Sequence, residues 1–375
     1  MDEGEPQASE AQAPEAQAPE RDAPEPSARR RTTSLRKKLA FTALIALGAP
    51  LLLELALRLA GLPSGIVRSF SGLWNPTLGP DTPGLFKPGA HRITYPRELA
   101  YSVRINALGL RGPEQARARP ADTLRVLALG DSVTFGYHVA DEEAYPARLA
   151  ALLRGRLGRP VEVLNGGCGH FSLPDERAYL ERLLPLDPQL CVLVVCSNDL
   201  GERELLRQPT LYEEIVSGAS RSKRSFLRET AVGEAQLRLA IALKEWRRRR
   251  AGEWPPKGFG EGEKLVVTPQ LWARYEQELS GLVARLRAAK VPLVVVLLSD
   301  LWELEEGRPA PHEERLAALA ARLGLPFAST FAPARAVQDP KTLYLWPLDA
   351  HPSARGNELL ARVVADLVPR ALPAR

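Results

Sequence analysis

Apolar runs alternate with amphipathic segments along the C-terminal two thirds of the chain. Five runs of mainly apolar residues occupy positions 124–130, 161–164, 190–195, 291–298 and 325–328. Continuous apolar runs of this length are typical of parallel strands that are buried on both faces. Segments with helical spacing follow these runs, at positions 145–157, 176–184, 268–289, 313–323 and 353–368. Strands that alternate with helices predict an α/β domain of three layers, α/β/α, built on a parallel sheet.

A longer apolar segment, residues 39–60, directly follows a basic stretch, residues 29–38. A helix rises about 1.5 Å per residue, so this segment is long enough to cross a hydrocarbon core of about 30 Å. The basic flank places the N-terminal end in the cytoplasm and the rest of the chain outside it. A cleaved secretory signal is the alternative, but the preceding tail and the apolar run are both longer than is usual for one. Glu54 and Arg58 are four residues apart and can pair on one helical face.

The regions on either side of this segment lack the α/β pattern. Residues 1–27 are rich in Pro, Ala, Glu and Gln and cannot bury enough apolar surface to fold. We therefore predict that residues 1–38 are a disordered cytoplasmic tail with a basic end. Residues 61–120 are rich in Pro, Gly and Arg and predict a collar between membrane and domain, with an edge strand at 101–106. The predicted α/β domain then spans residues 121–373.

Residues 201–264 interrupt the α/β pattern and carry no strand signal. This insertion holds most of the excess positive charge of the chain, whose formal net charge is +5. Its segment 234–250 predicts a basic amphipathic helix, which can lie on anionic headgroups or bind an acidic polymer. A solvated arginine face over a small apolar contact is the alternative. Because charges elsewhere are balanced, we expect no nucleic acid as a partner.

Small polar residues follow the first three predicted strands. Gly130 and Asp131 predict a tight turn that leaves the hydroxyl of Ser132 at the carboxyl end of the first strand. The glycines after Asn165 allow a backbone N–H to approach a bound group closely. Asn198 follows the third strand and can aim its amide at the same crevice. Since ligands of open α/β sheets bind at the carboxyl ends of the strands, these groups are expected to converge.

A loop just before the last predicted helix supplies a histidine and an acid. Asp349 and His351 are two residues apart, and Pro352 fixes the exit of the loop. An aspartate in this position can orient an imidazole that takes a proton from a serine.

Other residues with potential chemistry are interpreted as structural. The histidines interpreted as surface or internally satisfied residues are His91, His138 and His312, whereas the role of His170 stays open. The cysteines lack metal-ligand spacing and are interpreted as small core residues: Cys168, Cys191 and Cys196.

Four short motifs, in this order, resemble the four sequence blocks of the GDSL-type SGNH hydrolases. The motifs are Gly130-Asp-Ser132, Asn165-Gly-Gly167, Asn198-Asp199 and Asp349-Ala-His351. The resemblance covers about residues 100–370, without the insertion 201–264. The apolar helix, the collar and the segment 106–111 are similar to bacterial, membrane-anchored members of that family. The resemblance implies a flavodoxin-like parallel sheet of five strands, preceded by one transmembrane helix.

The resemblance also implies a serine esterase mechanism that needs no metal and no other cofactor. Ser132 is the implied nucleophile, His351 the general base, and Asp349 the residue that holds the tautomer of the imidazole. The implied oxyanion hole consists of the backbone N–H groups of Ser132 and Gly167 and the side-chain amide of Asn198.

Two positions depart from the family pattern. Cys196 stands where the third block usually has glycine, two residues before Asn198. The usual last block is Asp-x-x-His, whereas Leu348 occupies the position three residues before His351 and the acid follows it. A backbone carbonyl is therefore the alternative to Asp349 for orienting the ring.

These expectations together predict a single-pass protein of the bacterial inner membrane with an extracytoplasmic, periplasmic hydrolase domain. The expected substrate is a small, acetyl-like oxygen ester, carried by a glycan or lipid of the envelope. An O-acetyltransferase that acts on an envelope glycan is the nearest alternative. A second alternative is a non-catalytic envelope module that kept the fold and binds a partner through residues 201–264.

Overall fold

The computed structural model describes nine stretches of the chain, separated by short gaps. They are residues 34–60, 66–67, 70–75, 78–79, 82–93, 99–201, 205–217, 231–251 and 266–372. The predicted tail before residue 34 and parts of the predicted insertion lie outside these stretches. The chain divides into two units, residues 1–52 and 53–375, which are described separately.

Helix α1 (Leu35–Leu59) contains the long apolar segment. It begins four residues earlier than predicted, so that the basic residues 36–38 form its first turn. The helix is long and apolar enough to cross a membrane, and none of its residues is buried within the protein. Arg58 Nε lies 2.7 Å from Glu54 Oε1, which is the pairing that their spacing predicted.

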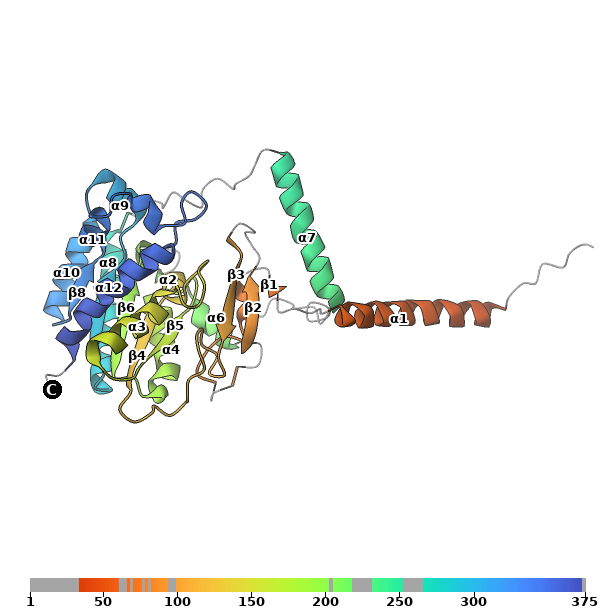
Figure 1. Cartoon of the computed structure of the whole chain (residues 1–375), viewed down its shortest axis with the longest axis horizontal. Helices are drawn as coiled ribbons and strands as arrows, with labels where there is room; N and C mark the ends of the chain where they lie inside the picture. The colour runs from red at the N-terminus through yellow and green to blue at the C-terminus, as the bar shows by residue number, and fades with distance from the viewer. Residues whose placement is uncertain are drawn as a thin grey trace, which may run out of the picture. The chain divides into compact units, whose positions relative to one another are not determined.

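The five predicted strands form one parallel sheet (Figure 1). The strands are β4 (Leu124–Gly130), β5 (Val161–Gly167), β6 (Leu190–Val195), β7 (Leu293–Leu297) and β8 (Phe327–Ser329). Their order is β5-β4-β6-β7-β8, and every neighbouring pair is parallel. This is the flavodoxin-like order, in which the chain changes direction across the sheet between the first and third strands. The predicted fold class is therefore confirmed.

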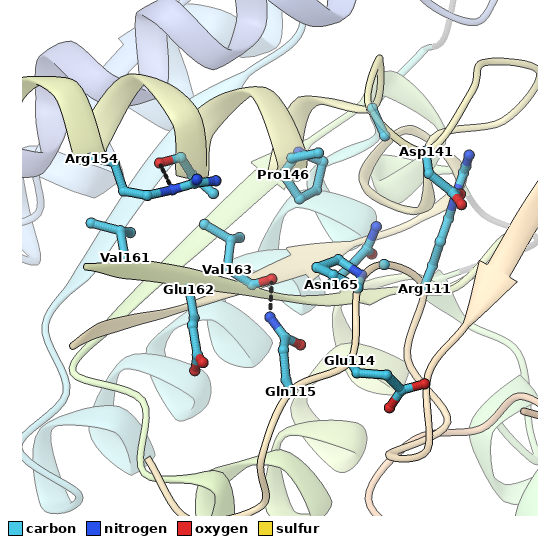
Figure 2. Close-up of a pocket in the computed structure, with 15 residues that line it drawn as sticks. Arg111, Glu114, Gln115, Asp141, Pro146, Arg154, Val161, Glu162, Val163 and Asn165 are labelled. Atoms are coloured by element: carbon cyan, nitrogen blue, oxygen red, sulfur yellow. Dashed lines mark hydrogen bonds and ion pairs between the residues drawn. The ribbon is translucent and has the colours of Figure 1, made fainter. Parts of the chain in front are cut away.

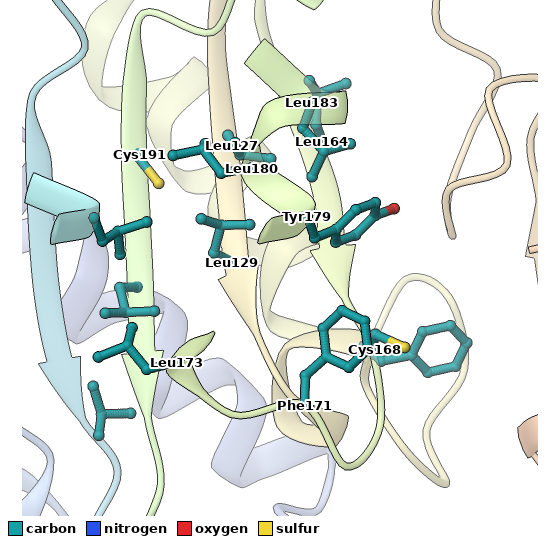
Figure 3. Close-up of a cluster of buried hydrophobic side chains, with 14 of the residues drawn as sticks. Leu127, Leu129, Leu164, Cys168, Phe171, Leu173, Tyr179, Leu180, Leu183 and Cys191 are labelled. Atoms are coloured by element: carbon teal, nitrogen blue, oxygen red, sulfur yellow. The ribbon is translucent and has the colours of Figure 1, made fainter. Parts of the chain in front are cut away.

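Helices cover both faces of this sheet and complete the three layers. The main helices are α3 (Tyr145–Leu157), α4 (Leu173–Leu183), α8 (Pro269–Ala288), α10 (Pro311–Arg322) and α12 (Ala354–Ala371). Side chains alternate along each strand, so Val126 and Ala128 join a core with α3 and α12. Leu127 and Leu129 point the other way and pack with residues of α4 and α8, as Figure 3 shows for α4.

Several boundaries differ from the predictions. Strand β5 continues to Gly167, so the Asn165-Gly-Gly motif ends the strand and does not form the following turn. Helix α4 begins at Leu173, because Asp175 accepts a hydrogen bond from the Ser172 backbone N–H at 3.1 Å and caps the helix. The shorter helices are α2 (Ser132–Phe135), η1 (Phe70–Leu73), η3 (Leu184–Leu186), η4 (Ser197–Leu200), α9 (Leu301–Glu306), α11 (Phe331–Arg335) and η6 (Pro340–Leu343).

Two helices lie in the described parts of the predicted insertion. They are α6 (Leu211–Ser217) and α7 (Ala231–Arg250). Helix α7 contains the basic amphipathic segment, and Leu239, Leu243 and Trp246 are exposed along it. Within the insertion, residues 202–204, 218–230 and 252–264 lie outside the described stretches.

The collar contains a small sheet of its own. Its strands are β1 (Ile66–Val67), β2 (Gly89–Ile93) and β3 (Tyr101–Ile105), in that order, and β3 is the predicted edge strand. Leu85, Phe86 and Leu110 are fully buried in the same core as α4 and α8. The collar therefore packs on the α/β body and is more than a linker.

The segment after β3 covers the open edge of the large sheet. The carboxamide oxygen of Asn106 accepts hydrogen bonds from the N–H groups of Leu108 and Leu110, at 3.0 and 3.1 Å. This turn brings Arg111 into an antiparallel bridge with Asn165 on β5. The chain itself thus covers the edge strand β5 at Asn165, near its carboxyl end.

The buried carboxyl group of Glu176 generates a prediction about stability. Burial, reinforced by the charges of Asp131 and Asp175, raises the pKa of Glu176 well above its usual value. The unfolded chain loses this proton above about pH 4.5, so folding takes up a proton and stability falls as pH rises. We expect Glu176→Gln to raise the unfolding midpoint, by an amount that grows between about pH 5 and pH 8. Each kcal/mol gained corresponds to about 2–4 °C.

Thermal unfolding of the full chain in mild detergent, followed by circular dichroism, measures this effect. Glu181→Gln is the matched control, because Glu181 is exposed on the same helix and pairs with Arg285 at the surface. If Glu176→Gln raises the midpoint temperature of unfolding by the same amount at every pH, the prediction is contradicted.

Candidate active site

The turn after β4 places a serine hydroxyl at the carboxyl end of the sheet. Gly130 has a φ of 151°, and a side chain there would collide with Thr134, whose Oγ1 would lie 2.1 Å from the added Cβ. Asp131 caps α2 by accepting a hydrogen bond from the Val133 backbone N–H at 2.8 Å. Ser132, the first residue of α2, is 9% exposed. The sequence predicted this turn correctly.

The loop before α12 brings a histidine to this serine from 219 residues away. His351 Nε2 lies 2.8 Å from Ser132 Oγ, within hydrogen-bond distance. On the other side of the ring, Nδ1 forms a short hydrogen bond with Asp349 Oδ1. The same carboxylate oxygen accepts from the His351 backbone N–H at 2.8 Å, which holds the two-residue loop in shape. The group that orients the ring in this structure is the Asp349 carboxylate.

The two groups shift each other's pKa. Burial acts to raise the pKa of Asp349, but the hydrogen bond and charge of His351 outweigh it and lower this pKa. Burial acts to lower the pKa of His351, but the hydrogen bond and charge of Asp349 outweigh it and raise this pKa. An imidazole that is made more basic and is hydrogen-bonded to a hydroxyl is suited to take its proton.

Asp131 also connects the serine turn to the end of β6. Its Oδ2 accepts a hydrogen bond from Asn198 Nδ2 at 3.0 Å, so the amide of Asn198 lies next to the serine turn. Cys196 has an extended backbone, with a φ of −114°, so this position does not require glycine. Its Sγ lies 3.7 Å from Asp131 Oδ1. The departure from the family pattern at Cys196 therefore leaves the strand end regular.

Gly167 lies at the end of β5, close to the serine helix. An added Cβ at Gly167 would lie 2.1 Å from the Phe135 backbone nitrogen, so only glycine allows this approach. The Gly167 N–H donates to Asn165 Oδ1 at 3.0 Å and is therefore occupied in this structure. Its role as an oxyanion donor stays a prediction.

Sequence reasoning missed the role of Arg111. The guanidinium is buried and donates to the backbone carbonyl of Phe135 at 3.0 Å, to that of Gly136, and to that of Val139 at 2.7 Å. It also forms an ion pair with Asp141 at 2.8 Å. One side chain of the collar thus fixes the loop that follows the serine helix. The segment 106–111 was singled out from the sequence, but no contact was assigned to Arg111.

The remaining histidines are distributed over the fold. His91 Nε2 bonds the Lys87 carbonyl at 2.8 Å, and His312 is buried on α10. His170 is exposed between β5 and α4, with a φ of 67°. His138, however, lies beside the Asp349–His351 pair, with its Nε2 3.8 Å from Asp349 Oδ2.

A separate pocket of about 160 Å³ lies between α3, the edge of β5 and residues 111–115 (Figure 2). Gln115 and Val163 both line the pocket, and Gln115 Nε2 donates to the Val163 carbonyl oxygen at 3.1 Å. Ser132, Asp349 and His351 do not line this pocket. It is therefore distinct from the site at the carboxyl end of β4.

Comparison with known proteins gives one family match. The model of the GDSL-like lipase/acylhydrolase family matches residues 128–359, which is more than half of the chain. This range includes Ser132, Asn198, Asp349 and His351. No curated protein sequence matches.

Several solved structures are similar over about two thirds of the chain. The lipase/acylhydrolase from Enterococcus faecalis is 14% identical, with a TM-score of 0.39 over 67% of this chain and 98% of that one. TesA is 16% identical, with a TM-score of 0.40 over 66% of this chain and 99% of that one. A variant of the acetyl-xylooligosaccharide esterase from Geobacillus Stearmophilus is 17% identical, with a TM-score of 0.37 over 67% of this chain and 97% of that one. All three TM-scores are below 0.5, so nothing about the substrate is inferred from them.

The glycine before the serine turn generates a prediction. We expect Gly130→Ala to lower the free energy of unfolding by at least about 2 kcal/mol, because the added methyl group collides with Thr134 in a backbone conformation that disfavours Cβ. Gly155→Ala is the matched control, since the position lies in helix α3 and an added Cβ there meets nothing within 4 Å. Chemical denaturation of both variants measures the difference. Equal stability of the two variants contradicts the prediction.

Proposed function

This chain belongs to the GDSL-like lipase/acylhydrolase family, and we propose that it is a membrane-anchored, extracytoplasmic serine esterase of small acyl esters. Family membership makes it a hydrolytic enzyme. The proposed nucleophile, base and acid are Ser132, His351 and Asp349. The observation that carries this proposal is the hydrogen bond of 2.8 Å between Ser132 Oγ and His351 Nε2, with Asp349 bonded to the other ring nitrogen.

In the proposed reaction, Ser132 Oγ attacks the ester carbonyl carbon while its proton passes to His351 Nε2. The tetrahedral intermediate collapses, the ester C–O bond breaks, and the leaving alcohol takes the proton from His351. Water then attacks the acyl group on Ser132 in the same way, releasing a carboxylic acid and restoring the hydroxyl. Asp349 stabilises the imidazolium that forms in both halves of the reaction and keeps the ring in the required tautomer.

The proposed oxyanion donors are the Ser132 backbone N–H, the Gly167 backbone N–H and the Asn198 side-chain amide. An amide nitrogen carries two hydrogens, so Asn198 can donate one to Asp131 and one to the oxyanion. Gly167 must release Asn165 Oδ1 before its N–H can contribute. One such donor is typically worth about 10²- to 10³-fold in rate.

The proposed location rests on the N-terminal part of the chain, and the proposed substrate class rests on that location. Helix α1 contains an apolar segment long enough to cross a membrane, and basic residues form its first turn, which supports an anchor with its N-terminal end in the cytoplasm. The hydrolase domain is then extracytoplasmic and meets envelope glycans and lipids as substrates.

Covalent labelling tests the proposed nucleophile. We expect a fluorophosphonate to label the wild-type chain once, because the serine oxygen is activated by His351 and attacks phosphorus. The label is expected to disappear in Ser132→Ala and to remain in Ser102→Ala, which changes an exposed serine on β3. Mass spectrometry of the labelled peptide identifies the site. Labelling that persists in Ser132→Ala refutes the proposed nucleophile, and absence of labelling in wild type favours a binding module.

The role of Asp349 has a separate kinetic test. We expect Asp349→Asn to lower kcat for 4-nitrophenyl acetate by about 10²- to 10⁴-fold with little change in KM, because an amide no longer favours the tautomer with hydrogen on Nδ1. Asp366→Asn, an exposed change on α12, is expected to behave as wild type. A loss of less than tenfold for Asp349→Asn indicates that another group orients His351.

A further inference from the structure

His138 carries a ring nitrogen that is directed at the proposed catalytic acid. The residue follows α2 in the loop that Arg111 fixes, and its side chain is 8% exposed. Its Nδ1 lies 2.9 Å from the Leu99 carbonyl oxygen. A carbonyl oxygen only accepts hydrogen bonds, so Nδ1 carries the hydrogen and Nε2 of the neutral ring carries a lone pair. This is the arrangement of most metal-binding histidines, whose second nitrogen donates to a backbone carbonyl or carboxylate.

The lone pair of His138 faces an oxygen that also carries lone pairs. His138 Nε2 lies 3.8 Å from Asp349 Oδ2, which is too long for a direct hydrogen bond. Two ligands at about 2.0–2.1 Å from one tetrahedral Zn²⁺ ion lie about 3.3–3.4 Å apart, so a shift of about half an ångström brings both atoms within reach of a shared ion. Asp349 Oδ2 is available for this purpose, because His351 uses the other carboxylate oxygen.

His351 supplies a third ligand to the same place. One ligand atom from each of His138, Asp349 and His351 lies within 4.8 Å of the other two. The rings of His138 and His351 are 5.7 Å apart between centroids, and the ring of Tyr101 lies 5.1 Å from that of His138. Two neutral imidazoles and one carboxylate are a common ligand set for Zn²⁺, and their net charge of about −1 attracts a divalent cation.

We propose that His138, Asp349 and His351 form a binding site for Zn²⁺ that inhibits the enzyme. The inhibitory effect rests on the proposed esterase function, whereas binding of the ion does not. An ion on His351 Nε2 blocks the nitrogen that receives the serine proton. An ion on Nδ1 moves the ring hydrogen to Nε2, which then cannot accept a proton. In both cases Ser132 is left without a base.

Binding is tested first, without turnover. Titration of ZnCl₂ into the full-length Ser132→Ala variant, in a calorimeter, is expected to show one equivalent bound, because all three ligands remain. Adding the His138→Asn change to the Ser132→Ala chain is expected to weaken Zn²⁺ binding at least tenfold. Asparagine tolerates the positive φ of 63° at this position and can still donate to Leu99. Adding His91→Asn removes a histidine elsewhere and is expected to leave the affinity unchanged.

Two outcomes of this titration overturn the site: no saturable binding by the Ser132→Ala chain, or equal affinity after the His138→Asn change. Circular dichroism melts of each variant without zinc establish that the ligand change has not unfolded the chain. If His138→Asn fails to fold, His138→Gln replaces it, because glutamine supplies no imidazole nitrogen and is again expected to weaken zinc binding at least tenfold. Unchanged affinity in a folded His138→Gln chain also counts against the site.

Inhibition is tested with 4-nitrophenyl acetate in the chain that carries Ser132. Zn²⁺ is expected to inhibit wild type and His91→Asn at the same concentration, and EDTA is expected to restore their activity. His138→Asn is expected to need at least tenfold more Zn²⁺, each variant being compared with its own activity without zinc. Zinc that binds without inhibiting overturns the inhibitory role. An absence of esterase activity in wild type refutes the proposed function and leaves the calorimetric result on the site standing.

Discussion

The site depends on the carboxylate of Asp131, which joins the ends of two neighbouring strands. It accepts hydrogen bonds from the Val133 N–H at the start of α2 and from the Asn198 amide after β6. Both strands lie at the point where the chain changes direction across the sheet. The serine turn and the amide are therefore held in a fixed relation by one buried acid, beside the loop that carries His351.

A second constraint comes from outside the α/β body. Arg111 belongs to the collar, yet its guanidinium donates to the carbonyl of the last residue of α2 and to two carbonyls of the following loop, and it pairs with Asp141. The same loop carries His138, whose ring is bonded to Leu99 on the collar side. The immediate surroundings of Asp349 are thus shaped jointly by the collar and the sheet, and not by the hydrolase domain alone.

The sequence was sufficient to predict the parallel sheet and the proximity of Ser132 and His351. Buried parallel strands are continuous apolar runs, and their carboxyl ends share one edge, so residues that follow them must converge. The sequence could not show that Gly167 donates to Asn165, that the collar shares the core of the sheet, or that His138 faces Asp349. These contacts join loops far apart in the chain, and side-chain packing, which leaves no periodic pattern, determines them.

The shared core of the collar and the body has a consequence for how this architecture evolves. Recombination between related genes exchanges a segment without damage only when few contacts cross its borders. A crossover near residue 120 would separate Arg111 from the loop it holds and Leu110 from its neighbours in the core. We therefore expect an exchange of the α/β body alone to lose the buried hydrogen bonds of Arg111 and the packing of Leu110.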